Sequence, residues 1–220
     1  MLLTPTVFVV DDDTPVLDSL TSLLGGHGFI AECFPSAEEY LSQVTPDRPG
    51  CLVLDLLMPG MTGVELLERM TALQCHRPVL AITGYSPMDA IVQIVKLGAV
   101  DVLQKPFSPS RLIESVRKAL QIDAARREGR SECVQARLKI NALSAEERMV
   151  LSGIVRGLTN QAIADELDVS LRTVQFRRTS LCKSLGLSRR SELLLLSQQA
   201  NWFPDRPVHQ TLPVSTPAGP

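Results

Sequence analysis

Short apolar runs alternate with amphipathic stretches along the first 120 residues of the chain. The runs are rich in β-branched residues, which predicts strands near 6–10, 29–34, 51–55, 79–83 and 100–104. Between and after them, apolar positions recur at helical spacing, which predicts helices near 14–25, 37–45, 62–73, 87–97 and 108–121. Five strand–helix units in this order predict an α/β fold, a doubly wound five-stranded parallel sheet.

The rest of the chain has a different pattern. Residues 122–141 are polar and rich in Arg and Glu, which predicts a helical linker that continues the preceding helix. Ser36-Ala-Glu-Glu39 predicts a capping box, and the similar Ser144-Ala-Glu-Glu147 opens a compact all-α segment that ends near Gln199. Five prolines from Pro204 onward predict a disordered tail. We therefore expect domains at 1–121 and 142–200, a linker at 122–141 and a tail at 201–220.

Four predicted strands run directly into polar residues suited to phosphate chemistry. These are Asp11-Asp12-Asp13, Asp55, Thr83 and Lys105. Because the carboxyl ends of parallel strands line one crevice, we expect these side chains to converge. A carboxylate that attacks a phosphoryl group needs a bridging cation and a second positive group opposite it. The pattern therefore predicts a metal-assisted phosphoryl site.

Charge divides the chain into two halves. Residues 1–120 hold 8 Lys/Arg and 14 Asp/Glu, a net charge of −6, whereas residues 121–200 hold 13 and 9, a net charge of +4. This favours a cation site in the first half and a polyanion partner for the second, with chance variation as the alternative. No apolar stretch reaches the length of a membrane span, so we expect a cytoplasmic protein without a membrane partner. Five scattered cysteines without a CxxC argue against a disulfide framework and a zinc site.

The four strand-end motifs together resemble the receiver domain of a two-component response regulator, which has a flavodoxin-like fold. The resemblance covers residues 6–121 and rests on the acidic cluster, on Asp55-Leu-Leu-Met-Pro-Gly-Met-Thr-Gly63, on Ile82-Thr83-Gly84 and on Gln104-Lys105-Pro106-Phe107. It implies that Asp55 accepts a phosphoryl group from a sensor histidine kinase with Mg²⁺ as cofactor, in a regulator that is not an enzyme.

The resemblance also assigns roles to the remaining site residues. Asp11, Asp12, Asp55 and the backbone carbonyl of Leu57 would hold Mg²⁺, while Lys105 and Thr83 would contact the phosphoryl oxygens. Asp13 stays outside this set, and Pro106 resembles a cis proline of the family. Taken singly, each residue has a purely structural alternative, such as acids placed at a helix start by the helix dipole.

Two residues depart from the family pattern. Val102 stands where the family usually places an aromatic switch residue, so the switch is either blunted or rerouted through Tyr85 or the helix from Pro87 to Leu97. The Leu57 side chain is apolar and should not orient a hydrolytic water, which predicts a long-lived phosphoryl group.

The second half resembles the LuxR-type helix-turn-helix of FixJ- and NarL-like regulators over residues 143–195. The resemblance rests on Leu143-Ser144, Glu147, Val150-Leu151, the run from Gly157 to Ala164, Leu167, Val169-Ser170 and Arg172-Thr173-Val174. It implies a first helix at 161–167, a turn at 168–170 and a recognition helix ending at Leu185.

Helical periodicity separates the two faces of that recognition helix. Val174, Leu181 and Leu185 should pack inward. The expected DNA contacts are Asn160, Arg172, Thr173, Gln175, Phe176, Arg178, Thr179 and Lys183. Gln175 and Phe176 are suited to base edges, whereas the basic residues and Asn160 are suited to phosphates. An ordinary solvated helix face is the alternative.

Joined together, the halves predict a transcription regulator controlled by phosphorylation. We expect double-stranded DNA as a partner, a homodimer after phosphorylation through the face of the fourth helix, fifth strand and fifth helix, and RNA polymerase as a further partner that the resemblance allows. The alternatives are a phosphorylation-independent DNA-binding regulator, an interaction module with a vestigial helix-turn-helix, and an aspartyl phosphatase. The last is disfavoured because Asp11-Asp12-Asp13-Thr14 places its threonine one position early.

Overall fold

The computed structural model describes residues 4–84 and 88–204, apart from the side chains of 88–90. Two compact units divide the chain between Arg127 and Glu128, and each is described by itself. Tyr85, Pro87 and the predicted tail beyond Pro204 lie outside the described residues.

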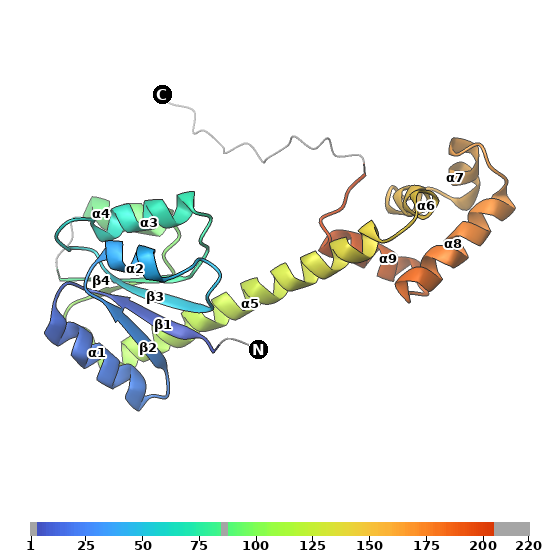
Figure 1. Cartoon of the computed structure of the whole chain (residues 1–220). Helices are drawn as coiled ribbons and strands as arrows, with labels where there is room; N and C mark the ends of the chain where they lie inside the picture. The colour runs from blue at the N-terminus through green and yellow to red at the C-terminus, as the bar shows by residue number, and fades with distance from the viewer. Residues whose placement is uncertain (1–3, 85–87, 205–220) are drawn as a thin grey trace, which may run out of the picture. The chain divides into compact units, whose positions relative to one another are not determined.

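The first unit contains a five-stranded parallel sheet in the order β2-β1-β3-β4-β5 (Figure 1). The strands are β1 (Thr6–Val10), β2 (Ile30–Phe34), β3 (Gly50–Asp55), β4 (Val79–Thr83) and β5 (Asp101–Gln104). The helices are α1 (Thr14–Gly26), α2 (Ala37–Gln43), α3 (Gly63–Ala72), α4 (Met88–Lys96) and α5 (Pro109–Asn141). The predicted doubly wound α/β fold is confirmed.

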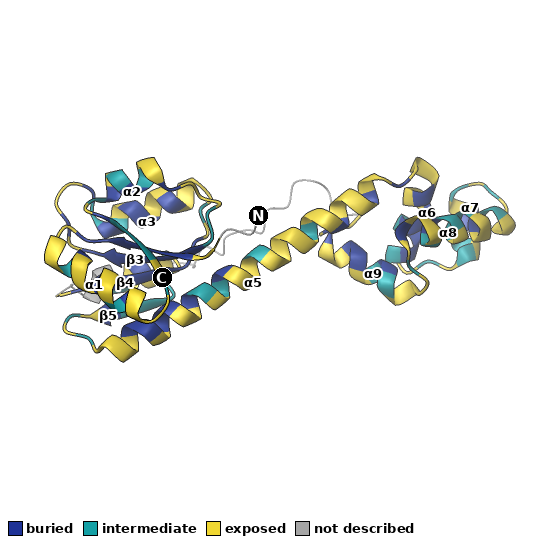
Figure 2. Cartoon of the chain, turned by 60° about the horizontal axis from the view of Figure 1, so that its bottom comes forward, coloured by how far each residue is buried: buried dark blue, intermediate teal, exposed yellow. Residues whose placement is uncertain are grey.

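Each face of the sheet has its own hydrophobic core. Phe8, Leu52 and Leu54 pack with Tyr40 of α2, Leu66 of α3 and Ile94 of α4 on one face. On the other face, Val7, Val9 and Val53 pack with Leu17 of α1 and Leu112 of α5. The alternation along each strand explains this division, because successive side chains point to opposite faces. Strands β1, β3 and β4 are buried along their whole length (Figure 2).

The second unit is all-α. It contains the end of α5 with α6 (Ala145–Val155), α7 (Asn160–Glu166), α8 (Leu171–Leu185) and α9 (Arg190–Gln199). Val150, Leu151, Ile163, Val174, Leu181 and Leu193 form its core with Ala136 and Ile140 of α5. The predicted C-terminal helical region is confirmed.

The helix starts show where the local predictions hold. Ser144 and Glu147 form a reciprocal capping box at α6, as does the unpredicted pair Thr62 and Glu65 at α3. The box predicted at α2 is only half formed. Ser36 accepts from the Glu39 amide at 3.2 Å, but Glu39 Oε1 accepts from Gln43 Nε2 at 2.9 Å. An alternative hydrogen bond along the helix therefore replaces the return bond.

Candidate phosphoryl site and nucleic-acid interface

The sheet register brings the polar residues of four strand ends to one edge. Val10 of β1 pairs with Leu54 of β3, so Asp11, directly after β1, lies beside Asp55 at the end of β3. Asp55 in turn pairs with Ile82 of β4. Thr83 pairs with Gln104, and Lys105 comes directly after β5. The carboxyl edge of the sheet therefore collects Asp11, Asp55, Thr83 and Lys105.

Three carboxylates and one ammonium meet at this edge. One oxygen from each of Asp11, Asp12 and Asp55 lies within 4.8 Å of the others. Lys105 Nζ donates to Asp55 Oδ2 at 2.6 Å and to Asp11 Oδ2 at 2.9 Å. Asp11 and Asp55 are buried, whereas Asp12 is exposed. The arrangement leaves a buried negative site with one lysine across it.

Backbone amides fix the other oxygens of the two buried carboxylates. Asp11 Oδ1 accepts from the Asp13 amide at 3.0 Å, and Asp55 Oδ1 accepts from the Leu57 amide at 3.0 Å. Asp13 itself caps α1 by accepting from the Val16 amide. Because it serves the helix end, Asp13 has the structural role that was the alternative for the whole acidic cluster.

Burial and hydrogen bonds shift the pKa values of Asp11 and Lys105. Burial raises the pKa of Asp11, while hydrogen bonds from Lys105 and the Asp13 amide oppose that rise. Burial works against the charged form of Lys105, but its hydrogen bonds to Asp55 and Asp11 prevail and raise its pKa above the ordinary value. Lys105 therefore stays a cation at neutral pH.

A glycine that the motif analysis did not single out shapes the loop after Asp55. A Cβ atom on Gly63 would lie 2.5 Å from the Asp55 carbonyl oxygen and 2.8 Å from the Leu56 Cα. Gly63 donates its amide to the Leu56 carbonyl at 3.2 Å. The loop thus folds back on the strand end only because this position has no side chain. The sequence signal was the glycine that closes the motif.

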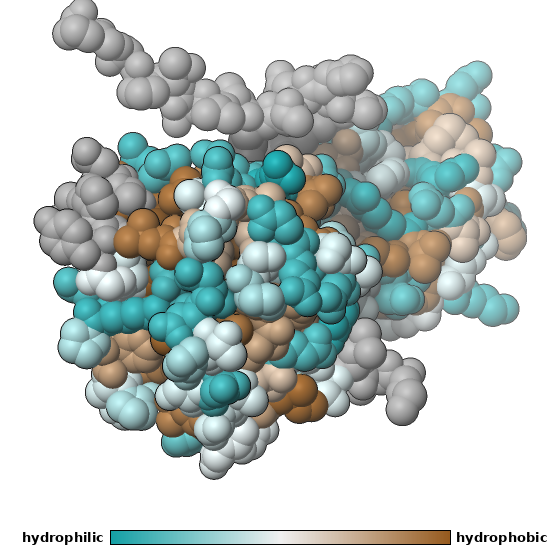
Figure 3. Space-filling view, turned by 60° about the vertical axis from the view of Figure 1, so that its left-hand side comes forward, coloured by the Kyte–Doolittle hydropathy of each residue, from teal (hydrophilic) through white to brown (hydrophobic). Residues whose placement is uncertain are grey.

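The remaining predicted residues have less direct placements. Thr83 is buried at the end of β4, and the Leu57 side chain is 58% exposed. Val102 is partly buried against the core beneath α2, α3 and α4. The Lys105–Pro106 peptide bond is cis, as predicted. Figure 3 shows a face of this unit on which hydrophilic side chains surround smaller hydrophobic patches.

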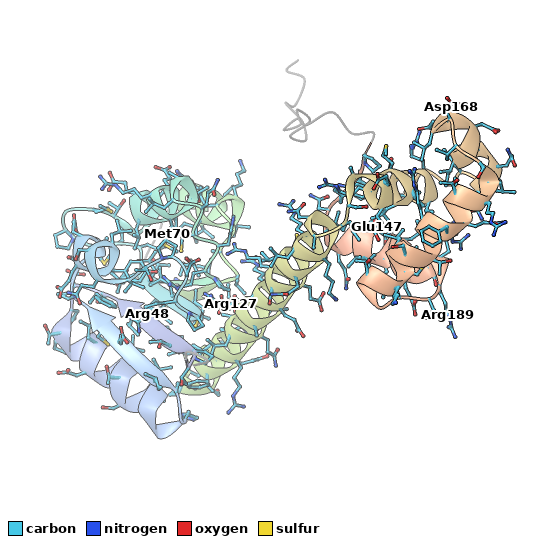
Figure 4. All side chains as sticks on the ribbon, turned by 45° about the vertical axis from the view of Figure 1, so that its right-hand side comes forward. Arg48, Met70, Arg127, Glu147, Asp168 and Arg189 are labelled. Atoms are coloured by element: carbon cyan, nitrogen blue, oxygen red, sulfur yellow. The ribbon has the colours of Figure 1, made fainter. Side chains whose placement is uncertain are left out.

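In the second unit, α7 and α8 form a helix-turn-helix. Thr159 caps α7 and Ser170 caps α8, each accepting from the backbone amide three residues ahead. Between the helices lies Asp168, which is labelled in Figure 4. Its left-handed φ of 51° makes the turn tight. Local capping and turn chemistry therefore build the motif.

The faces of α8 separate as helical periodicity predicts. Val174, Leu181 and Leu185 are buried, which confirms the inward stripe. Arg172, Gln175, Phe176, Thr179 and Lys183 are exposed, and Phe176 is 75% exposed. Thr173, Arg178 and Asn160 are partly exposed, with Arg178 donating to Asn160 Oδ1 at 3.3 Å. A large exposed phenylalanine beside basic and amide side chains suits a surface that contacts another molecule.

A buried glutamate ties α8 to α6. Glu147 Oε1 accepts from Ser180 Oγ and Ser184 Oγ, both at 2.9 Å, and Oε2 accepts from the Ser144 amide at 3.0 Å (Figure 4). The Ser144 amide bond, followed by the Ser180 bond, lowers the pKa of Glu147. The sequence reasoning missed this contact; its only signal was two serines one helical turn apart.

Together, a receiver-like carboxylate site and a helix-turn-helix define a signal-responsive DNA-binding regulator. Residues 7–117 match the response regulator receiver domain, and residues 141–197 match the bacterial regulatory proteins of the luxR family. The chain therefore belongs to the response regulators with a LuxR-type DNA-binding domain and is a transcriptional response regulator of a two-component system.

Similar proteins span nearly the same length. The chain is 37% identical over 201 residues to the transcriptional regulatory protein FixJ of Bradyrhizobium diazoefficiens. This alignment covers 90% of this chain and 97% of FixJ. It is 32% identical over 193 residues to the response regulator protein TodT of Pseudomonas putida, covering 88% and 85%. The solved structure of the response regulator StyR has 37% identity, a TM-score of 0.79 and coverage of 89% of this chain and 99% of that one.

No helix in the described part of the chain is long and apolar enough to cross a membrane.

Proposed function

We propose that Asp55 accepts a phosphoryl group from a sensor histidine kinase and that this modification controls DNA binding by α8. One observation carries the proposal, namely that Lys105 Nζ lies 2.6 Å from Asp55 Oδ2 inside a cluster of three carboxylates. A lysine held this close by a buried acid is positioned to pair with the charge of an incoming phosphoryl group. The cytoplasmic location is part of the same proposal. So are the domain boundaries at 121, 141 and 200, with the first turns of the linker, up to Arg127, packed on the first unit.

The residues at the edge of the sheet fit a magnesium ion. Asp11, Asp12 and Asp55 provide hard carboxylate oxygens within 4.8 Å of one another, and the Leu57 carbonyl would be a further ligand. When bound, Mg²⁺ would neutralise part of the negative charge that otherwise repels a phosphoryl donor. Burial of Asp11 beside Asp55 makes such neutralisation necessary, because Lys105 supplies only one positive charge.

The transfer forms one bond and breaks another. An Asp55 oxygen attacks phosphorus as the P–N bond of the donor phosphohistidine breaks, and the imidazole nitrogen keeps the electron pair and takes up a proton. Lys105 then pairs with a phosphoryl oxygen in place of the Asp55 carboxylate. The Thr83 hydroxyl, at the end of the neighbouring strand, would donate to another.

The proposal extends to the lifetime of the product. Leu57 follows Asp55 by two residues and directs a mostly exposed apolar side chain away from the core. Such a side chain has no group to orient or deprotonate water, so the phosphoryl group should persist. Loss of the group within seconds in a hydrolysis time course would contradict this expectation.

The DNA contacts proposed for the second unit divide by chemistry. Gln175 would read a base edge and Phe176 a thymine methyl, while Asn160, Arg172, Arg178 and Lys183 would contact the phosphate backbone. Thr173 and Thr179 complete the proposed set. Support comes from the exposure of this helix face against a fully buried opposite stripe.

Phosphorylation would act on DNA binding through a homodimer. Val92 and Val95 of α4 are exposed at 44% and 57%, and α4 belongs to the face that we propose to pair. Two copies would present two recognition helices to successive major grooves. RNA polymerase would then be a partner of the DNA-bound form.

Intact mass tests the acceptor directly. The full chain is mixed with Mg²⁺ and a small acyl-phosphate donor beside Asp55→Ala, with Asp13→Asn as a matched control because Asp13 caps α1. We expect one phosphoryl group on the wild type and on the control, and none on Asp55→Ala. An adduct on Asp55→Ala, or none on the wild type, would contradict the proposal.

One observation favours a second candidate, a phosphorylation-independent DNA-binding regulator. Val102 packs against the core and, being β-branched and short, has no buried and exposed poses to exchange. A regulator of this kind would bind DNA equally well after Asp55→Ala.

A further inference from the structure

A buried acid on α5 joins this helix to the strand that ends in Asp55. Asp123 is 5% exposed, and its Oδ2 accepts from the Gly50 amide at 2.8 Å and from Arg127 Nε at 2.7 Å. Gly50 is the first residue of β3 and Asp55 is the last. A strand of this length spans about 17 Å. Asp123 therefore contacts one end of β3, and the acceptor lies at the other.

Glycine is required at the strand start for this contact. Gly50 has a φ of 141°, and a Cβ atom there would lie 1.8 Å from the Thr6 carbonyl oxygen. The glycine lets the chain enter β3 in a conformation that directs its amide to the Asp123 carboxylate.

Arginines extend the contact to the loop before β3. Arg127 Nη1 donates to the Asp47 carbonyl at 2.6 Å and Nη2 to the Arg48 carbonyl at 2.7 Å (Figure 4). The Arg48 carbonyl also accepts from Nη2 of the buried Arg77 at 3.0 Å. Asp123 and Arg127 thus attach α5 to backbone groups at the start of β3 and in the loop before it.

A third α5 side chain reaches the segment that leads into β4. Arg126 Nη1 donates to the His76 carbonyl at 2.9 Å, three residues before Val79. Strand β4 ends in Thr83. The two buried strands that end in Asp55 and Thr83 are therefore both attached, near their starts, to residues 123–127 of α5.

Residues 123–127 of α5, which we call the anchor, lie outside the part of the chain that matches the receiver family. That match ends at residue 117. From Glu128 to Gln135 the helix is exposed except at the partly buried Cys133. Ala136 and Ile140 then enter the core of the DNA-binding unit. Among the described residues, the contacts of 123–127 therefore come directly before the exposed stretch of α5 that leads into the second unit.

We propose that Asp123 is a positioning residue through which phosphorylation at Asp55 changes the DNA-binding unit. A signal between distant sites requires an element whose states both sites bias. We assign this role to strand β3 with the Asp123–Arg127 contact, because β3 has Asp55 at one end and is hydrogen-bonded to α5 at the other. This inference rests on the proposed function.

The test measures the rise in DNA affinity on phosphorylation in the full chain. The probe is a duplex that the wild type selects from a random-sequence library, titrated at one salt concentration with and without an acyl-phosphate donor. Asp123→Asn and Arg127→Gln are compared with Glu132→Gln, a matched exposed acid on the same helix. Intact mass records phosphorylation of every sample.

We expect the wild type and Glu132→Gln to gain about 5–150-fold in affinity, the usual range for coupled sites. Asp123→Asn and Arg127→Gln should be phosphorylated to the same extent and bind equally without donor, but gain less than about twofold. If Asp123→Asn does not fold, the partly exposed Arg127→Gln decides by the same criterion.

A gain equal to that of the wild type in the anchor variants would overturn the positioning role and leave the proposed function intact. A wild type that is phosphorylated without any gain would overturn the proposed function, and the anchor with it.

Discussion

The proposed phosphoryl site joins residues as far as 94 positions apart, whereas the proposed DNA contacts lie almost entirely on one helix of 15 residues. In the first region, proximity comes from sheet register, and Asp11, Asp55 and Thr83 are buried. In the second, it comes from helical periodicity, and most of the side chains are exposed. Substitutions in the first region should therefore change the chemistry of the site through its buried charges. Those in the second should change DNA affinity with little effect on the fold.

Removing the lysine of the buried site should have the largest effect. Lys105→Ala leaves Asp11 and Asp55 without their hydrogen-bonded cation. We expect phosphorylation from an acyl phosphate to slow by about 10²–10³-fold, the usual cost of removing one charge-stabilising donor. Intact mass over time gives the rate, and Lys96→Ala, an exposed lysine on α4, should match the wild type. Equal rates for Lys105→Ala and the wild type would remove the lysine from the chemistry.

Substitutions on α8 should weaken DNA binding and leave the fold unchanged. Gln175→Ala should reduce discrimination at one base pair by about 1–3 kcal/mol. Lys183→Ala should weaken binding to all sequences alike and reduce the slope of log K against log salt by about 1. Fluorescence anisotropy titrations measure both effects, with Gln198→Ala of α9 as the exposed control. A change of specificity in Lys183→Ala would reverse the assigned roles.

Glu147 is an exception to the difference between the two regions. It is a buried charge, but it supports α8, whose other face is exposed. Glu147→Ala removes hydrogen bonds from Ser180 and Ser184 and should cost about 2 kcal/mol of unfolding free energy. Trp202, the one tryptophan of the sequence, packs against the core of this unit and reports its denaturation by fluorescence. The neighbouring exposed Glu146→Ala should change little. Equal losses in both variants would show that Glu147 has no special role.

The smallest expected effect is on pH dependence. Hydrogen bonding lowers the pKa of folded Glu147 below the ordinary value for a glutamate. The stability from this group is therefore fully present above the ordinary carboxyl range and is lost as pH falls through the lower folded pKa. The difference in unfolding free energy between wild type and Glu147→Gln should stay constant from pH 7 to about pH 5 and shrink in more acidic solution. A difference that grows toward acid would contradict this sign.

Much of this organisation could be predicted from the sequence. Strands β1, β3 and β4 are buried, largely apolar runs with clear limits, and the inward stripe of α8 follows from apolar spacing. The convergence of Asp11, Asp55 and Lys105 followed from the rule that parallel strands end at one edge. Both kinds of prediction rest on periodicity or on topology.

Contacts between side chains and distant backbone groups could not be predicted. Asp123 lies in a segment interpreted as linker, and its contact with Gly50, 73 positions away, leaves no periodic trace. The prediction that the Glu39 side chain accepts from the Ser36 amide was wrong, because Gln43 offers a competing donor one helical turn ahead. Such choices depend on which partners the folded chain brings within reach.

We propose that phosphorylation of Asp55 controls DNA binding by α8. This is tested by measuring the DNA affinity of wild type and Asp55→Ala, each with and without Mg²⁺ and an acyl-phosphate donor, at one salt concentration. We expect a rise in affinity for the wild type alone. Equal affinities in all four samples, with the wild type phosphorylated by intact mass, would contradict it and favour the phosphorylation-independent regulator.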